Sequence, residues 1–122
     1  MGFGSDLRKI AQRRNLDLRM ISRTVPLRIF NAVVRDTRVD TGRLRGNWQV
    51  TGSTPALTAI PRLDKNEGGP LAADEALKVK AFSVTHLTNN LPYAQVYEEK
   101  DAMIGRAIAD FKRLVREEVK KL

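Results

Sequence analysis

The segment from residue 5 to residue 36 constrains the fold most, because as a helix it carries two apolar faces. Ser5 or Asp6 can cap its start, and apolar residues recur with the helical period of about 100° per residue. The first stripe comprises Leu7, Ala11, Leu18, Ile21, Val25, Ile29 and Ala32. The second lies roughly opposite and comprises Leu16, Met20, Leu27, Phe30 and Val34. A stable fold must therefore cover this helix on both sides.

Two arrangements can cover the second stripe. A chain of 122 residues has room for one modest core, so a second subunit is one candidate cover. Alternatively, Pro26 lacks a backbone donor and crowds the preceding turn, so a kink or break near Thr24 brings both stripes into one core. Because Leu16 and Met20 precede the proline, we favour a subunit contact.

Two strand-like segments flank a long irregular one. Residues 45–52 alternate polar and apolar side chains, which predicts a half-buried strand with Trp48 and Val50 on one side. Residues 53–77 contain three of the five prolines, so we expect a long loop with one helical turn after Pro70. A loop of this length is usually functional, or is ordered by a neighbouring molecule.

The C-terminal half predicts one more strand and two helices. The strand covers residues 78–88, with Phe82 and Val84 on one side. A short helix over 93–99 follows, and then a helix over 101–122 that Asp101 can cap. The apolar stripe of this last helix consists of Ile104, Ile108, Phe111, Val115, Val119 and Leu122. Because the stripe is one-faced, we expect the helix to pack on the sheet.

Together these segments predict a single α+β domain. Its parts are a long N-terminal helix kinked near Pro26, a small antiparallel sheet with a long loop between the strands, and a C-terminal amphipathic helix.

Composition removes most kinds of catalytic site. There is no cysteine and only one histidine, His86, which excludes disulfides, thiolate chemistry and histidine-rich metal sites. The acidic cluster of Glu98, Glu99 and Asp101 is explained by its position at a helix start, where carboxylates oppose the helix dipole. We therefore expect no enzymatic activity, no metal and no cofactor. Without a run of roughly 20 apolar residues or a signal leader, we also expect no membrane contact.

The basic residues are concentrated in the N-terminal part. The net charge is +8, and residues 1–50 contribute +7 of it, nearly all from arginine. Arginine is favoured where a planar guanidinium meets a carboxylate, a phosphate or a protein interface. A solvated cationic face is the simpler explanation. A nucleic-acid footprint is another, although the arginines are spread around the predicted helix and not along one face.

Two short motifs carry the most specific information. The segment VDTGRLRGNW, from Val39 to Trp48, joins the first helix to the first strand. In it Asp40 and Thr41 can hydrogen-bond a turn, and Gly42 can adopt a positive φ, so local physics alone predicts a helix-to-strand turn. In the segment TNNLPYAQVYE, which begins at Thr88, two asparagines can satisfy backbone groups at a strand end.

In this order and spacing, the two motifs resemble the tailed-bacteriophage family of head–tail joining and tail-completion proteins, which includes lambdoid minor tail proteins. The matching positions are Asp40, Thr41, Gly42, Leu44, Arg45, Trp48, Thr88, Asn89, Tyr93, Ala94 and Glu98. The resemblance implies a structural protein of the virion neck or tail end, made in the bacterial cytoplasm. Its copies would form an oligomeric ring beside other neck, connector or tail proteins. DNA would pass through that ring without sequence-specific binding.

Several residues are candidates for the contacts in such a ring. Tyr93 and Tyr97 carry amphipathic rings that suit an interface, or are ordinary residues at the edge of the core. Glu98 is a candidate partner for Arg43 or Arg45 of a neighbouring subunit. The candidate interface set is Leu16, Met20, Leu27, Phe30, Val34, Arg43 and Tyr97. The alternative function is a basic nucleic-acid-binding protein, and a hydrolase is the least supported.

Overall fold

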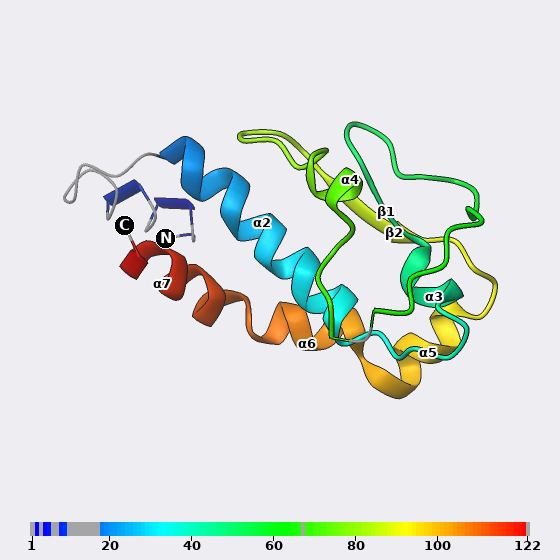
Figure 1. The fold of residues 1–122 in the computed structure, drawn as a ribbon. Helices are drawn as coiled ribbons and strands as arrows, with labels where there is room; N and C mark the ends of the chain where they lie inside the picture. The colour runs from blue at the N-terminus through cyan, green and yellow to red at the C-terminus, as the bar shows by residue number, and fades with distance from the viewer. Residues whose placement is uncertain (1, 3, 6–7, 10–17, 67, 122) are drawn as a thin grey trace.

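The structure is a computed structural model that describes residues 2, 4–5, 8–9, 18–66 and 68–121. Its elements are α2 (Leu18–Arg35), α3 (Arg43–Gly46), β1 (Trp48–Thr51), α4 (Ala73–Ala76), β2 (His86–Asn89), α5 (Ala94–Asp101), α6 (Met103–Ala109) and α7 (Phe111–Lys121). In Figure 1, α2 lies between the C-terminal helices α6 and α7 on one side and the sheet with its loops on the other. The fold is α+β, as the sequence predicts.

Helix α2 organises the apolar interior. The main core joins it to the sheet and to α6 through Val33, Val34, Leu44, Trp48, Val50, Leu71, Val79, Leu91, Met103 and Ala107. A smaller cluster of Ile21, Val25 and Val115 fastens the first half of α2 to α7. Each such buried side chain contributes roughly 1.5–3 kcal/mol. The two clusters together explain why α2 needs apolar residues on more than one face.

The chain itself covers most of the second apolar stripe. Val34 is buried in the main core, and Leu27 and Phe30 pack half-buried against it, so the predicted subunit contact is wrong for Val34. Of the kink or break predicted near Thr24, the break is absent, because α2 continues through Pro26. Met20 remains half-exposed. Leu16, like most of the predicted helix before Leu18, lies outside the described residues.

The sheet consists of β1 and β2 in antiparallel register, with Trp48 opposite Asn89 and Val50 opposite Leu87. Trp48 and Val50 are buried on one face, as the alternation predicts. The strand predicted over 45–52 nevertheless starts too early. The N–H of Gly46 donates to the carbonyl of Gly42 at 2.9 Å, which closes the helical turn α3 before the strand begins.

The second strand predicted over 78–88 is wrong for most of its length, because only His86–Asn89 is a strand. β1 ends at Thr51, opposite His86, so the residues before His86 have no strand to pair with. Instead, Arg23 of α2 donates to the carbonyl of Val79 at 3.1 Å. Phe82, in a left-handed conformation with φ of 55°, is exposed together with Val84.

The long loop between the strands has the predicted helical turn, α4, after Pro70. Its own chain holds it in place: the N–H of Ile60 donates to Asn47 Oδ1 at 2.8 Å, and Arg62 Nε donates to the carbonyl of Gly46 at 2.9 Å. The Asn47 side chain and the Gly46 backbone thus help to order the loop within the chain itself, without a neighbouring molecule.

The C-terminal region contains three helices where the sequence predicts two. α5 runs on to Asp101, and Ala102, in a left-handed conformation with φ of 49°, separates it from α6. The carboxylate of Glu98 accepts from the N–H groups of Ile104 and Gly105 at 2.9 and 3.1 Å. Glu98 therefore caps α6, the role predicted for Asp101.

The buried face of α6 also differs from the predicted stripe. α6 and α7 pack mainly on α2, whereas the sequence predicts packing on the sheet. Met103 and Ala107 are buried, whereas Ile104 and Ile108 are exposed. The left-handed residue before α6 redirects the chain, and this changes which residues face α2. The predicted stripe is correct at Val115, which is buried against α2.

Candidate functional site

The two sequence motifs meet at one half-open depression of about 470 Å³. Its lining is Arg38, Asp40, Thr41, Gly42, Arg43, Leu44, Tyr93, Val96, Tyr97 and Lys100. These residues come from the connection between α2 and α3, from α3, and from α5 with the residue before it, which lie together at one end of the molecule (Figure 1). Segments that are distant in the sequence therefore share one surface.

The turn at Gly42 forms one wall of this depression. Gly42 has φ of 86°, and a Cβ at this position would lie 2.8 Å from the carbonyl group of Asp64, so only glycine fits. The N–H of Asp64 donates to the Gly42 carbonyl at 2.8 Å. Thr41 Oγ1 accepts from the N–H of Arg43 at 3.3 Å. The turn chemistry predicted for the first motif is present, and it also anchors the long loop.

Arg45 is buried behind this turn. Its terminal nitrogens donate to the carbonyl of Val34 at 2.8 Å and to that of Gly69 at 2.6 Å, and its Nε lies 3.7 Å from Asp64 Oδ2. The guanidinium thus joins the end of α2 to the long loop. It is not accessible to a neighbouring subunit, so Arg45 is excluded as the partner proposed for Glu98.

Three hydrogen bonds fix the buried residues beneath the two motifs. Trp48 Nε1 donates to Thr37 Oγ1 at 2.8 Å, and this hydroxyl donates to the carbonyl of Val33 at the end of α2. Asn89 Nδ2 donates to the carbonyl of Leu44 at 2.8 Å, which links the second motif directly to the first. Trp48 and Asn89 therefore position the depression without lining it, whereas Leu44 is itself part of the lining.

The remaining motif residues have mixed surroundings. Ala94 packs half-buried against the core. The hydroxyl of Thr88 is buried and has no hydrogen-bond partner within the described part of the chain. Glu98 is occupied as the cap of α6. Among the matched positions, Asp40 and Thr41 are exposed and available on the surface.

Aromatic rings and cations form the opposite wall. Tyr93 and Tyr97 meet edge to face with their centroids 5.7 Å apart, and the Arg38 guanidinium lies 4.7 Å from the Tyr97 centroid. Arg38 also makes two hydrogen bonds to Asp101, at 2.6 and 2.7 Å. These bonds lower the pKa of Asp101 and raise that of Arg38. Lys100 Nζ lies 5.9 Å from the Tyr97 ring on the same wall.

This arrangement suits binding. Exposed charges of both signs, on Asp40, Arg43 and Lys100, surround aromatic and aliphatic side chains.

Within the described residues, no group of three His, Cys, Asp or Glu side chains can hold a metal ion. His86 Nδ1 lies 2.8 Å from the carbonyl of Gly52, so its side chain links the start of β2 to the residue that follows β1. In the same part of the chain, no helix is long and apolar enough to cross a membrane.

The outer edge of β1 carries a polar pair that sequence reasoning missed. Glu75 Oε2 accepts from the N–H of Val50 at 2.6 Å, and Arg62 donates to the carbonyl of Trp48 at 2.8 Å. The two side chains form an ion pair at 3.3 Å. They occupy backbone groups that would otherwise template a further strand. Arg62 lies in an irregular stretch and Glu75 in the single turn α4, and neither stretch is long enough to show a periodicity, so the sequence alone could not identify the pair.

No protein-family model, no curated protein and no solved structure matches this chain. The fold and the site together define a small α+β protein whose two motifs build one charged, aromatic depression open to solvent.

Proposed function

We propose that this protein is a structural subunit of a tailed-bacteriophage virion, in an oligomeric ring that completes the tail or joins it to the head. The observation that carries the proposal is the convergence of the two motifs on one depression. The motifs resemble those of neck and tail-completion proteins, and their buried members fix a surface whose exposed members are free to contact a neighbour.

The composition of the depression supports a protein–protein contact. Val96 and Tyr97 supply apolar and aromatic area, while Arg43, Lys100 and Asp40 supply charge around it. A partly apolar centre with a polar rim is typical of protein interfaces, and arginine and tyrosine are enriched in them. A ring needs head-to-tail contacts, in which this surface meets a different surface of the next subunit. Arg43 remains the candidate interface arginine, since Arg45 is buried.

Nucleic-acid binding is the less favoured function, because many arginines are engaged within the chain. Arginine side chains that bind the chain's own carbonyl or carboxylate oxygens are those of Arg23, Arg28, Arg38, Arg45, Arg62 and Arg113. Phosphate-driven affinity falls steeply with salt, whereas a largely apolar subunit contact does not. A titration of duplex DNA at two salt concentrations therefore separates the two functions.

Complementation tests the proposal directly. A phage that lacks the gene is supplied with wild-type protein, with Arg43→Glu, or with the matched control Arg116→Glu, which changes an exposed arginine of α7. We expect Arg43→Glu to yield folded protein and a large loss of infectious titre, with unjoined heads and tails in electron micrographs. We expect Arg116→Glu to keep the wild-type titre. Equal titres for Arg43→Glu and wild type would contradict the proposed interface.

A further inference from the structure

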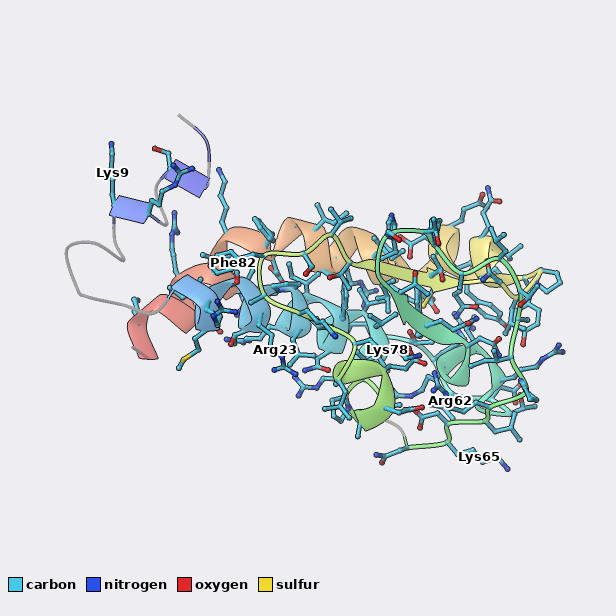
Figure 2. All side chains as sticks on the ribbon, turned by 90° about the horizontal axis from the view of Figure 1, so that it is seen from above. Lys9, Arg23, Arg62, Lys65, Lys78 and Phe82 are labelled. Carbon is cyan, nitrogen blue, oxygen red and sulfur yellow. The ribbon has the colours of Figure 1, made fainter. Side chains whose placement is uncertain are left out.

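A second surface, separate from the motif depression, lies where the segment before β2 crosses α2. Its apolar members are unusually exposed: Leu77 at 73%, Val84 at 70%, Phe82 at 66% and Met20 at 50%. Figure 2, which is seen from above relative to Figure 1, labels Phe82 and Arg23, two residues at this surface. We call the surface formed by Met20 and residues 77–85 the loop–helix face.

The exposed side chains of this face are held in place. The N–H of Phe82 donates to Ser22 Oγ at 3.2 Å, and Arg23 donates to the carbonyls of Val79 and Ala76 at 3.1 and 3.4 Å. The Arg19 guanidinium lies 5.8 Å from the centroid of the Phe82 ring. α2 therefore fixes this segment with its large apolar side chains turned to solvent. Phenylalanine with φ of 55° is uncommon, and such strain is often found at functional positions.

Two adjoining depressions lie on this face. One, of about 500 Å³, is lined by Arg19, Met20, Arg23, Thr24, Leu77, Val79, Lys80 and Ala81. The other, also of about 500 Å³, is lined by Thr51, Gly52, Leu77, Lys78, Lys80, Ser83, Val84 and Thr85. They share the lining residues Leu77 and Lys80 and so adjoin each other; we call the pair of depressions the trough.

The charge of the trough has a single sign. Arg19, Arg23, Lys78 and Lys80 line it, and among the described residues no carboxylate does. The nearest acid, Glu75, is buried and already binds Arg62, Lys78 and the N–H of Val50. A ligand that fits must therefore bring apolar side chains together with negative charge.

We propose that the loop–helix face docks a segment of a partner protein that combines apolar and acidic side chains. A polypeptide fits better than a nucleic acid, because the exposed area is largely aliphatic. Single-stranded nucleic acids bind by stacking their bases on aromatic rings, and among the described residues no aromatic side chain lines the two depressions. The inference is independent of the ring: absence of the protein from virions would remove the ring and leave this docking surface in place.

Fluorescence anisotropy with defined probes tests the inference on the full chain. The probes are a labelled synthetic peptide that alternates leucine and glutamate, its leucine–lysine counterpart, and a short oligothymidylate. We expect the glutamate peptide to bind at least about tenfold more tightly than the lysine peptide, and more weakly as salt rises. Equal affinities for the two peptides, or no binding of the glutamate peptide, would overturn the inference.

Variants locate the binding on the molecule. The double variant Phe82→Ser/Val84→Ser should lower the affinity for the glutamate peptide about tenfold or more, because it removes exposed apolar side chains that the peptide would contact. The control Leu57→Ser changes an exposed leucine of a different loop and should alter binding less than about twofold. Circular dichroism checks that each variant folds.

Lys80→Glu, which reverses an exposed charge, provides a second test: it should lower the preference for the glutamate peptide over the lysine peptide. Equal effects of the double variant and Leu57→Ser, or oligothymidylate binding tighter than the glutamate peptide, would contradict the docking surface.

Discussion

Buried polar side chains hold the region around the first motif together. Arg45 bonds the last turn of α2 to Gly69, while Glu75 and Arg62 occupy the outer edge of β1. A buried charge is stabilising only when its hydrogen bonds are satisfied, and removal of one partner leaves the others unpaired. The depression therefore depends on residues that do not line it.

Replacement of Arg45 by methionine tests this dependence. The variant loses the hydrogen bonds to Val34 and Gly69 and leaves the buried Gly69 carbonyl without this donor, while the Val34 carbonyl keeps only the N–H of Thr37. We expect the free energy of unfolding to fall by about 3 kcal/mol, measured by urea denaturation. Arg43→Met, two residues away and exposed, should change it by less than about 0.5 kcal/mol. Similar losses for both variants would show that the buried guanidinium has no special role.

The close approach of the long loop to the first motif also predicts a mutational effect. A Cβ at Gly46 would lie 2.1 Å from the carbonyl oxygen of Arg62, whereas a Cβ at Gly52 would meet nothing within 4 Å. We expect Gly46→Ala to destabilise the protein by about 2 kcal/mol or more, because backbone must move. Gly52→Ala should be nearly neutral in the same thermal or urea denaturation, and a neutral Gly46→Ala would contradict the observed packing.

At the level of elements, α2 is tied to the C-terminal helices by ion pairs as well as by the core. Arg28 bonds Glu117 of α7 at 2.8 Å, and Arg38, just beyond α2, bonds Asp101 of α5. Within α6, the cap comes from Glu98 of the preceding helix. The ion pairs thus connect α7 to α2, and α5 to the segment just beyond α2.

The cap of α6 can be tested with a neighbouring control. Glu98→Ala removes the acceptor for the N–H groups of Ile104 and Gly105, and loss of a helix cap typically costs about 1 kcal/mol. Glu99→Ala changes an exposed carboxylate for which the described structure gives no hydrogen bond, and it should be nearly neutral. Urea denaturation of both variants measures the difference, and equal stabilities would contradict the cap.

The ion pairs predict how stability depends on pH. Hydrogen bonds from Arg38 lower the pKa of Asp101, and hydrogen bonds from Arg28 and then Arg113 lower the pKa of Glu117. A lowered folded-state pKa adds stability above the unfolded value of about 4, and this stability is lost as pH falls through the folded pKa. We therefore expect the melting temperature to drop below about pH 4. The drop should be smaller in Asp101→Asn/Glu117→Gln than in wild type or in Glu99→Gln, and identical pH profiles would contradict this role.

The elements differ in how far local pattern predicts them. Trp48 and Val50, the turn at Gly42 and the helical turn after Pro70 follow from local chemistry, and the structure contains all three. The strand over 78–88 fails because a strand needs a pairing partner, and β1 ends at Thr51. Asp101 leaves its predicted cap position because Arg38, far away in the sequence, binds it. For this strand and this cap, residues that are distant in the sequence determine the structure, and a local sequence pattern does not include them.

The candidate site shows the same division. The motifs identified the residues that build the depression, since Asp40 to Leu44 and Tyr93 both line it. They did not distinguish buried supports such as Arg45 from exposed residues such as Arg43, because burial depends on where the long loop packs. Val34 was assigned to a subunit contact for the same reason: the pattern shows an apolar face without showing what covers it.

At the scale of the whole molecule, two surfaces are available to partners. The motif depression lies near α3 and α5, and the loop–helix face lies over the first half of α2 (Figure 1). Head-to-tail assembly requires two different surfaces on each subunit, so a molecule of this kind can contact one neighbour through the depression while another surface meets a second protein. With a net charge of +8, copies of the chain repel one another in solution.

Cryo-electron microscopy of virions that carry a tagged copy of this protein tests the central proposal most directly. We predict density for a closed ring at the head–tail junction or tail end, in which the chain fits with Arg43 and Tyr97 at the contact between adjacent subunits. Complete absence of the protein from mature particles would contradict the proposed structural role.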